Sequence, residues 1–409
     1  MYPGAIAAEA PDKVAYLMAG SGEAVTYGQL DERSNRLAQV LRGRGLRAGD
    51  GVAILMENNA RYLEVCWAAQ RSGLYYTAIS SRLTGPEVAY IVADCGAKAL
   101  VSSRSMAGVA AEAAALCPEA GVRLMVGGAA EGFEAYEEVV AGAPAGPVDG
   151  ETEGADMLYS SGTTGRPKGV KVALRGVPVG TPGPLFLLLT ALYGVDRDSV
   201  YLSPAPQYHA APLRFCMAAT RAGATLVIME HFDPEGFLAC VQDHRVTHTQ
   251  VVPTMFVRLL RLAPEVRAGY DLSSLRCVIH AAAPCPVPVK ARMIEWWGPV
   301  LQEYYAGTEG NGLCAIDSEQ WLAHPGSVGR PIIGAVHVAD DEGKELGPGE
   351  TGTVWFEGGS TFEYHNDPVK TAASRHPSGW TTIGDIGHLD DDGWLYLTDR
   401  KAFMIISGG

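Results

Sequence analysis

The sequence predicts an α/β protein with two subdomains built on parallel β-sheets and a small antiparallel, barrel-like β subdomain. Short apolar runs alternate with amphipathic helical patterns in residues 52–101, and the same alternation returns in residues 200–304. Strands that alternate with helices form parallel sheets with right-handed crossovers. From Gly326 onward the apolar runs shorten and are separated by Gly, Pro and Asp, which is typical of antiparallel hairpins.

The first subdomain is expected over residues 1–150. Thr26 and Gln29 have the spacing of a helix capping box, and apolar residues then recur at helical spacing until Gly43. The same capping pattern returns at Thr84 and predicts a helix there. The other elements expected are a helix over 60–70, strands over 52–55, 74–79 and 98–101, and surface helix and linker in the Ala-, Gly- and Glu-rich residues 110–150.

The second subdomain is expected over residues 151–325. Residues 204–212 are too rich in proline for regular structure, so a loop is expected there. Asp233 and Pro234 supply an N-cap and a first-turn proline for a helix. The strands expected are 200–203, 225–228, 249–252, 277–281 and 300–304, and the helices are 213–222, 233–244, 254–262 and 287–297.

The third subdomain is expected over residues 326–398, with hairpin strands at 334–338, 353–356 and 393–397. The sequence stops within an apparent strand and turn, where natural domains rarely end. Residues 399–409 are therefore expected to hold a hinge and the start of a further domain.

The composition describes an ordinary globular protein with an acidic surface. Hydrophobic residues make up 47% and charged residues 19%, and the formal net charge is −14, which argues against nucleic acid and anionic membranes as partners. The eight cysteines have no zinc-like spacing, which favours reduced core cysteines. No signal peptide is visible, and the longest apolar run, residues 185–192, is too short to span a bilayer. These features predict a cytoplasmic enzyme without a transmembrane segment.

Residues 159–169, Tyr-Ser-Ser-Gly-Thr-Thr-Gly-Arg-Pro-Lys-Gly, are the stretch best suited to hold ATP. Glycines let the backbone turn and expose N–H groups to an anion, and the hydroxyls can donate to phosphate oxygens. Lys168 adds a mobile positive charge. The stretch is not a Walker A loop, because Pro167 precedes the lysine and Gly169 follows it. A Gly- and Ser-rich linker between strands is the alternative interpretation.

Residues 160–169 match every position of the phosphate-binding signature of the adenylate-forming superfamily, which they resemble. That superfamily includes acyl-CoA synthetases, luciferases and peptide-synthetase adenylation domains, and the resemblance extends over about residues 25–409. It implies that Lys168 and Thr164 act in catalysis and that Thr164 also lies near the metal. The nucleotide-binding loop residues that it implies are Ser160, Ser161, Gly162, Thr163, Thr164, Gly165 and Lys168.

Residues 301–309, Leu-Gln-Glu-Tyr-Tyr-Ala-Gly-Thr-Glu, resemble the Tyr-Gly-x-Thr-Glu motif, with Ala306 in place of the usual glycine. The resemblance implies that Tyr305 stacks on adenine, that Thr308 contacts the α-phosphate, and that Glu309 is a catalytic Mg²⁺ ligand. Mg²⁺ prefers one or two carboxylates together with phosphate oxygens. A strand-to-turn segment with a surface glutamate is the alternative interpretation. The nucleotide contacts implied here are Glu303, Tyr304, Tyr305, Ala306, Gly307 and Thr308.

Residues 380–385 resemble the Thr-Gly-Asp motif, and residues 397–401 resemble the hinge motif. By resemblance, Asp385 accepts hydrogen bonds from the ribose, Asp399 is the hinge, and Arg400 approaches the ribose or a phosphate. Considered alone, an aspartate after a glycine is a turn residue, and a hinge needs only a few residues that absorb backbone rotation.

Residues 207–209 resemble the segment that lies over the substrate carboxylate, and residues 280–284, His-Ala-Ala-Ala-Pro, resemble the stretch that flanks adenine and the acyl pocket. His209 is accordingly a catalytic candidate, with a satisfied surface histidine as the alternative. Small side chains in the second segment allow a ligand to approach closely and also suit core packing. The nucleotide contacts implied are Ala281, Ala282, Ala283 and Pro284, and the acyl wall is Tyr208, His209, Val252, Met255, Ala281 and Ala282.

The resemblance implies that a hydrophobic, preferably fatty, carboxylic acid is activated by ATP with Mg²⁺ and then joined to coenzyme A. An aryl-acid ligase, an adenylation domain that loads a carrier protein, and a nucleotide- or acyl-binding module without turnover are the alternatives. The expected partners are a small carboxylic acid, ATP and coenzyme A. An acyl-carrier protein as acyl acceptor and assembly as a homodimer are two further possibilities that the sequence leaves open. Superfamily members end in a small domain that bears a further lysine, and this sequence stops before it. We therefore expect acyl-AMP binding, slow adenylation and no detectable thioester formation from these 409 residues.

Overall fold

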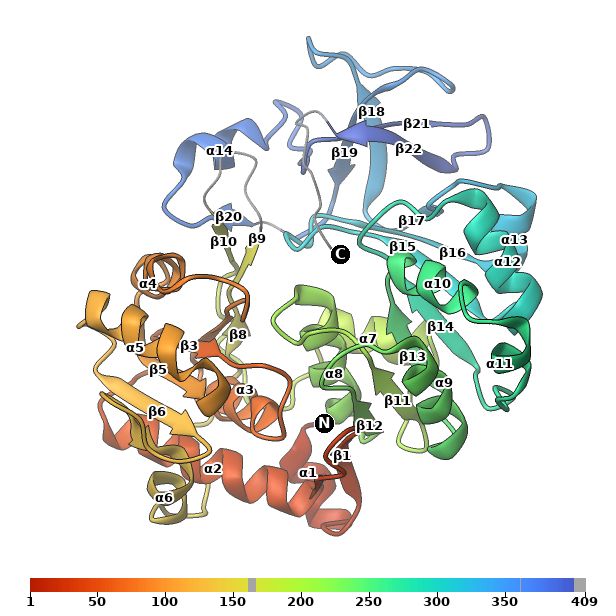
Figure 1. The fold of residues 1–409 in the computed structure, drawn as a ribbon. Helices are drawn as coiled ribbons and strands as arrows, with labels where there is room; N and C mark the ends of the chain where they lie inside the picture. The colour runs from red at the N-terminus through yellow and green to blue at the C-terminus, as the bar shows by residue number, and fades with distance from the viewer. Residues whose placement is uncertain (161–166, 361, 401–409) are drawn as a thin grey trace. The chain divides into compact units, whose positions relative to one another are not determined.

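The structure, a computed structural model, describes residues 1–160, 167–360 and 362–400 (Figure 1). The chain divides into two compact units, of which unit 1 is Met1–Ser160 with Lys171–Phe232 and unit 2 is Ser161–Val170 with Asp233–Gly409. Parallel α/β sheets occur in both units and an antiparallel sheet occurs in unit 2, so the predicted fold class is confirmed. The finer division into three subdomains and a hinge stays a prediction.

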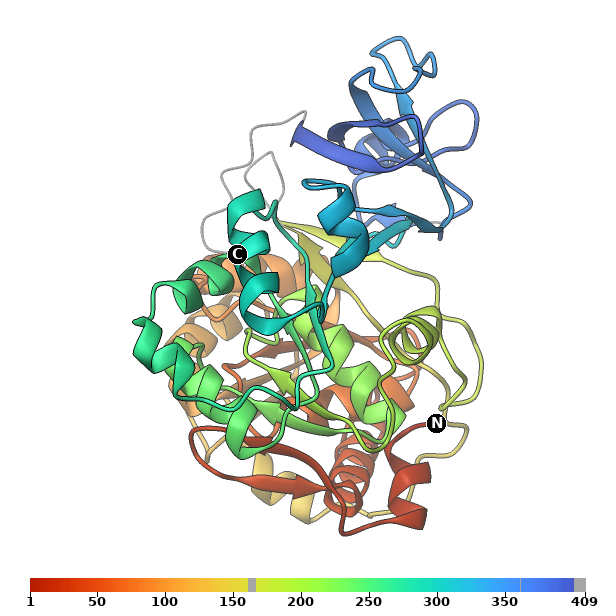
Figure 2. The ribbon, with the colours of Figure 1, turned by 90° about the vertical axis from the view of Figure 1, so that its right-hand side faces the viewer.

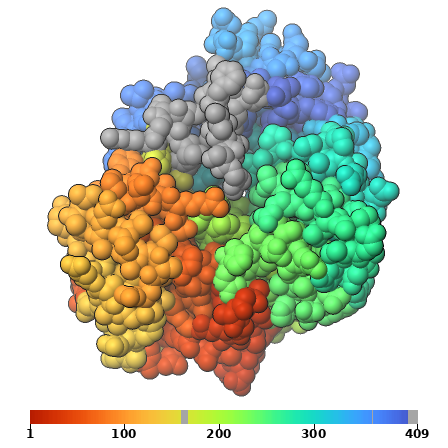
Figure 3. Space-filling model, viewed as in Figure 1, coloured from red at the N-terminus to blue at the C-terminus, as the bar shows by residue number. Residues whose placement is uncertain are grey.

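The first part of unit 1 is a parallel sheet covered by helices. Its strands are β3 (Gly51–Leu55), β4 (Tyr75–Ala78), β5 (Ala97–Ser103), β6 (Val122–Val126), β7 (Glu134–Ala135) and β8 (Ala155–Asp156), in the order β7-β6-β5-β3-β4-β8. Its helices are α2 (Tyr27–Gly43), α3 (Tyr62–Arg71), α4 (Gly85–Asp94), α5 (Ala107–Leu116), α6 (Tyr136–Ala141) and the 3₁₀ turn η1 (Arg104–Met106). Helices α4 and α5 bury their apolar sides in one cluster with β3 and β5. They lie in the orange and yellow part of the space-filling view (Figure 3).

Two local predictions are confirmed in this part and one is wrong. Thr26 and Thr84 each cap a helix in a reciprocal capping box, as their spacing predicts. The expectation of surface helix and linker over residues 110–150 fails at β6, which is a parallel strand paired with β5. Its Val122 and Leu124 are buried. The strand is stabilised by a distant partner, and the Ala-, Gly- and Glu-rich composition around it gives no sign of that partner.

The second part of unit 1 joins the start of the chain to residues 200–228. Its strands are β1 (Val14–Met18), β2 (Ala24–Thr26), β9 (Leu158–Ser160), β11 (Val200–Ser203) and β12 (Thr225–Ile228), and its helices are α1 (Pro3–Glu9), α7 (Pro184–Ala191) and α8 (Ala210–Ala222). Strand β12 pairs in parallel with both β1 and β11, and β2 runs antiparallel to β1. The predicted loop 204–212 is wrong at its end, because α8 already begins at Ala210. Pro212 lies in the first turn of α8, where the missing N–H costs no helical hydrogen bond.

Unit 2 begins with an α/β sheet. Its strands are β13 (His248–Val251), β14 (Cys277–His280), β15 (Leu301–Tyr305), β16 (Leu313–Asp317) and β17 (Arg330–Ile333), and its helices are α9 (Pro234–Asp243), α10 (Pro253–Leu260), α11 (Pro264–Ala268), α12 (Val287–Trp297) and α13 (Ser318–Ala323). The three predicted strands β13, β14 and β15 are parallel neighbours. Strands β16 and β17, which the sequence pattern does not predict, add an antiparallel edge.

The rest of unit 2 is antiparallel. Its elements are β10 (Lys168–Lys171), β18 (Ala335–Ala339), β19 (Gly352–Glu357), β20 (Glu363–Tyr364), α14 (Pro368–Ala373), β21 (Asp385–Leu389) and β22 (Leu395–Arg400). Strands β18, β19, β21 and β22 pair side by side in this order, and all four are drawn in blue in the two ribbon views (Figures 1 and 2). The short strand β20 pairs with β10. Hairpins in this region are confirmed, although β21 is missed by the sequence pattern.

A search of the helices in the described ranges finds none with the length and apolar character needed to cross a membrane.

Candidate functional site

Two motifs that lie far apart in the sequence meet at the ends of β15 and β21. Tyr305, the last residue of β15, donates a hydrogen bond of 2.7 Å from its hydroxyl to Oδ2 of Asp385, the first residue of β21. The Tyr305 ring also packs against Phe356, with ring centroids 6.0 Å apart. Asp385 is buried. An aromatic face and a fixed carboxylate at one place are suited to a nucleoside, because a base can stack and a ribose can donate.

Glu309 is held by a residue that no motif includes. Its carboxylate is buried, and Oε1 accepts a hydrogen bond of 2.7 Å from the hydroxyl of Tyr364. Its other oxygen, Oε2, lies 2.7 Å from the position that a Cβ would take on Gly307, so a side chain at 307 would collide with the carboxylate. Glycine at 307 therefore keeps one carboxylate oxygen free of a neighbouring side chain.

The surroundings of Glu309 fit Mg²⁺ that arrives with a nucleotide. In the ranges that the structure describes, no group of three or more His, Cys, Asp or Glu side chains is arranged to hold a metal ion. Mg²⁺ in nucleotide enzymes keeps several waters and takes one or two carboxylates plus phosphate oxygens. A single buried carboxylate with a fixed orientation meets that requirement.

Lys168 begins β10 and forms an ion pair with Asp367, the residue before α14. The hydrogen bond from the ammonium of Lys168 lowers the pKa of Asp367. The other oxygen of Asp367 caps α14 by accepting a hydrogen bond of 2.9 Å from the backbone N–H of Lys370. This contact links residues 199 positions apart, and the sequence signal for it is only an N-cap aspartate followed by proline.

A buried ionic cluster lies beneath the ends of β14 and β15. The Lys290 ammonium of α12 is 2.5 Å from Oε2 of Glu303, and His280 Nε2 is 3.5 Å from the same oxygen. Burial lowers the pKa of Lys290 and raises the pKa of Glu303. Glu303 is proposed from its motif as a nucleotide contact, but its carboxylate is occupied by Lys290. The sequence gives no sign that α12 would supply this partner.

The small-residue stretch after β14 has an unusual backbone. Ala282 has φ +76°, a left-handed conformation in which a Cβ is strained. A glycine would adopt this conformation freely. Ala281 is buried, and Ala283 and Pro284 continue the turn towards α12. Strained backbone of this kind is common where a ligand is positioned.

The predicted acyl wall is divided between the units. In unit 2, Val252 is the N-cap of α10 and Met255 is buried in its first turn. The side-chain amide of Gln250 on β13 donates a hydrogen bond of 3.4 Å to the hydroxyl of Tyr304 on β15, with β14 between the two strands. That the wall forms one pocket with the residues of unit 1 stays a prediction.

In unit 1, Tyr208 and His209 stand next to each other at the start of α8, with ring centroids 4.5 Å apart. Buried Asn58 fixes the loop before them by accepting a hydrogen bond of 2.8 Å from Gln207 N and donating to the backbone of Ala205. His209 is exposed, and partial desolvation of its ring by neighbouring groups, and then the charge of Arg82, lower its pKa, which favours a neutral imidazole near pH 7. A neutral ring suits an uncharged acyl wall.

Several predicted residues are described only in part. Ser161, Gly162, Thr163, Thr164 and Gly165 lie outside the described residues. Ser160 ends β9, Ala306, Gly307 and Thr308 follow β15, and the backbones of Asp399 and Arg400 pair with those of Ile386 and Asp385. The roles proposed for all of them stay predictions.

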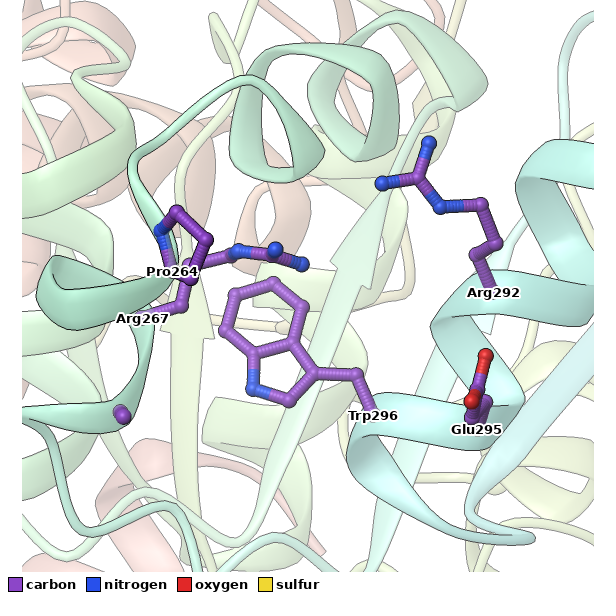
Figure 4. A pocket seen from close by; sticks show the side chains of 6 residues that line it. Pro264, Arg267, Arg292, Glu295 and Trp296 are labelled. Carbon is purple, nitrogen blue, oxygen red and sulfur yellow. The ribbon is translucent and has the colours of Figure 1, made fainter.

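A surface pocket of about 440 Å³ lies between α11 and α12 (Figure 4). It is lined by Pro264, Arg267, Ala268, Arg292, Glu295 and Trp296, and the Arg267 guanidinium carbon lies 5.2 Å from the centroid of a Trp296 ring. None of these residues belongs to a motif described above.

Known proteins are similar to this chain in sequence and in fold. The AMP-binding enzyme family matches residues 5–364. The chain is 33% identical over 394 residues to feruloyl-CoA synthase of Amycolatopsis sp, which covers 95% of this chain and 76% of that protein. It is 31% identical over 404 residues to the long-chain-fatty-acid–CoA ligase FadD13 of Mycobacterium tuberculosis, and the match covers 98% of this chain and 78% of that protein. The solved structure of the amide bond synthetase McbA from Marinactinospora thermotolerans superposes with a TM-score of 0.84 at 28% identity, covering 98% of this chain and 79% of that one. The chain therefore belongs to the AMP-binding enzyme family, in which ATP, Mg²⁺ and coenzyme A serve to form acyl-adenylates and then thioesters.

Proposed function

We propose that this protein activates a hydrophobic carboxylic acid with ATP and transfers the acyl group to coenzyme A. The observation that supports the proposal is a set of three contacts within unit 2, namely Tyr305 with Asp385, Glu309 with Tyr364, and Lys168 with Asp367. The Tyr305 ring and the Asp385 carboxylate suit the nucleoside of MgATP. The fixed Glu309 carboxylate suits the Mg²⁺ ion, and Lys168 suits the phosphates.

The residues of unit 2 would orient and neutralise the nucleotide. Tyr305 stacks on the base and Asp385 accepts hydrogen bonds from the ribose. Glu309 would hold Mg²⁺, which when bound neutralises charge on the phosphate oxygens. Lys168 exchanges its ion pair with Asp367 for the phosphates. Positioning and charge neutralisation of this kind account for most of the catalysis in phosphoryl chemistry.

The reaction then proceeds in two substitutions. A carboxylate oxygen of the acid forms a bond to the α-phosphorus while the bond from this phosphorus to its bridging oxygen breaks, and pyrophosphate leaves. The coenzyme A sulfur, which has lost its proton, next forms a bond to the acyl carbon. The bond between that carbon and the phosphate oxygen breaks, and AMP leaves. Lys168 acts in the first step because negative charge grows on the departing pyrophosphate.

The acid is proposed to be hydrophobic because the wall residues carry no charge. Met255, Ala281 and Ala282 offer apolar surface in unit 2, and Tyr208 does so in unit 1. Desolvation, and then the charge of Arg82, lower the pKa of His209 and favour its neutral form. Each buried methylene contributes roughly 0.8 kcal/mol at most, so affinity for alkanoates should rise with chain length until the pocket is filled. A zwitterionic amino acid would leave its ammonium unpaired.

An aryl acid is the second candidate, and the polar pair on β13 and β15 favours it. The Gln250 amide and the Tyr304 hydroxyl, hydrogen-bonded at 3.4 Å, could pair with a ring hydroxyl of a substrate. One relative is named feruloyl-CoA synthase and another is named a long-chain-fatty-acid–CoA ligase, so both acid classes belong in the test.

Pyrophosphate exchange into ATP tests adenylation directly, without the thioester step. Octanoate, palmitate, ferulate, benzoate and leucine are compared, and acyl-AMP is identified by mass spectrometry. A parallel arm adds coenzyme A or an acyl-carrier protein as the acceptor. Exchange that requires an alkanoate supports the proposal, and exchange with ferulate or benzoate alone establishes the second candidate. Nucleotide binding without exchange for any acid would refute both and leave a binding module.

Glu309→Gln should lower the exchange rate by on the order of a hundredfold or more, because it removes a charged metal ligand. Glu319→Gln, an exposed glutamate on α13, is the matched control and should keep the rate. Equal rates for the two variants would remove Glu309 from the metal site.

A further inference from the structure

Asp367 and Lys370 lie in the segment from β20 into α14 and belong to none of the motifs. It is fixed against the strand that begins with Lys168, since the backbone N–H of His365 donates a hydrogen bond of 2.8 Å to the carbonyl of Gly169. Val170, Phe362 and Tyr364 are buried in one apolar cluster. The backbone pairing and this cluster together determine where Asp367 and Lys370 lie.

Lys370 lies on the tyrosine that holds the metal-type carboxylate. Its ammonium nitrogen is 3.9 Å from the centroid of the Tyr364 ring, and the hydroxyl of this ring donates to Glu309 at 2.7 Å. Three charged groups, Lys168, Glu309 and Asp367, act on it electrostatically. The Lys370 ammonium is therefore within the same charged site as the proposed phosphate lysine and metal ligand.

The ammonium of Lys370 has no direct counter-ion among the residues that the structure describes, because no carboxylate oxygen approaches it within 4.0 Å. Asp367, which is nearest in sequence, directs one oxygen to Lys168 and the other to the backbone N–H of Lys370. Burial, and then the charge of Lys168, lower the pKa of Lys370. The Lys168 ammonium pairs with Asp367 and the Lys370 ammonium lies in the same charged site, so a further anion would stabilise both lysines.

We propose that Lys370 is a second phosphate-binding lysine, which contacts the polyphosphate of ATP together with Lys168. Asp367 is then a positioning residue that holds Lys168 and caps α14 until the polyphosphate takes its place as the partner of Lys168. The inference rests on the proposed function, since it takes ATP as the ligand. A flexible ammonium is suited to this role because it can follow the charge as a point donor.

Binding of inorganic pyrophosphate, measured by calorimetry in EDTA, tests the role of Lys370 without metal and without turnover. Lys370→Gln should raise the Kd for pyrophosphate by about tenfold, the usual effect of one lost charge-assisted contact. Its Kd should also depend less on salt concentration than that of the unchanged protein. Lys370→Arg should restore most of the affinity. Lys344→Gln removes the same charge from an exposed turn of unit 2 and should stay within twofold.

A second measurement uses the unchanged protein and so does not depend on how a variant folds. Reductive methylation followed by mass spectrometry reports how accessible each lysine is. Pyrophosphate should slow methylation of Lys168 and Lys370 severalfold and leave Lys344 unaffected. An unchanged Kd in Lys370→Gln, or protection of Lys168 without Lys370, would overturn the proposal.

The two levels of the proposal fail in different ways. If the unchanged protein exchanges pyrophosphate into ATP with an acid while Lys370→Gln binds pyrophosphate normally, only the inference about Lys370 is refuted. If the unchanged protein binds neither pyrophosphate nor ATP, the proposed function itself is refuted.

Discussion

Replacing Lys290 by methionine should destabilise the protein by about 3–5 kcal/mol at pH 7. The ammonium of Lys290 is fully buried and lies 2.5 Å from Glu303, whose side chain is 7% exposed. Methionine fills a similar volume but removes the charged partner of the carboxylate and leaves only His280 Nε2, 3.5 Å from the same oxygen, beside it. Glu303 must then stay ionised in an apolar site or take up a proton. At pH 7, which is about 2.7 pH units above an ordinary glutamate pKa, protonation costs about 3.7 kcal/mol.

The loss of stability should depend on pH with a definite sign. In the variant the folded state raises the pKa of Glu303 above its unfolded value, so the folded state binds a proton that the unfolded chain releases. Stability relative to the unchanged protein therefore falls as pH rises above about 4.3. The destabilisation should shrink to about 1 kcal/mol at pH 5. Adding Glu303→Gln should recover most of the loss at pH 7, because the buried charge is then absent.

Urea unfolding followed by tryptophan fluorescence measures these differences, and the ring of Trp321 lies 4.8 Å from the Lys290 ammonium. Lys98→Met is the matched control, since Lys98 pairs with Asp50 but is 55% exposed and should change stability by less than about 1 kcal/mol. The reasoning is refuted if Lys290→Met loses less than about 1 kcal/mol at pH 7, or if its loss is the same at pH 5.

The remaining predictions concern the same strand ends. Tyr364→Phe removes the hydrogen bond to Glu309 and should reduce the adenylation kcat about tenfold with little change in the KM for the acid. Steady-state kinetics measures both constants, and an unchanged kcat would contradict this prediction. Ala282→Gly relieves a left-handed φ of +76° and should raise stability by up to about 1 kcal/mol, whereas Ala281→Gly should lower it; thermal melts compare the two, and a lower melting temperature for Ala282→Gly would argue against strain. Burial, and then the charge of the Lys290 ammonium, hold the pKa of His280 well below its usual value. As pH falls, the unfolded chain therefore binds a proton on His280 that the folded protein does not bind. Stability should therefore fall by up to about 1.4 kcal/mol per pH unit below about pH 6.5, and His280→Gln should flatten this slope in urea titrations.

Much of the fold follows from local patterns in the sequence. The capping boxes at Thr26 and Thr84 place two helices, and the alternation of apolar strands with helices gives the parallel order of β13, β14 and β15. The sequence pattern misses strands β6, β16 and β17, each of which is stabilised by pairing with another strand. Pairing with a distant partner leaves no periodic signal in the strand itself.

The candidate site divides in the same way. The contact between Tyr305 and Asp385 joins two recognisable motifs, so the sequence brings both residues to notice even though they are 80 positions apart. Glu303 shows the limit of that approach, since its place in a motif does not reveal that Lys290 would occupy its carboxylate. Asp367 and Lys370 lie in a polar stretch without periodicity, where only a proline after an N-cap residue hints at structure.

Local charge resolves the conflict between an acidic protein and a polyanionic ligand. A net charge of −14 opposes the approach of ATP, so binding depends on cations whose charge is not already neutralised. Lys290 is committed to Glu303 in the core and contributes structure. Asp367 directs one oxygen to Lys168 and the other to the backbone N–H of Lys370 at the cap of α14. An arriving polyphosphate would therefore meet one exchangeable ion pair and one ammonium that has no direct counter-ion among the described residues. The acidic surface as a whole does not attract ATP, so a second lysine at this place adds local positive charge that does.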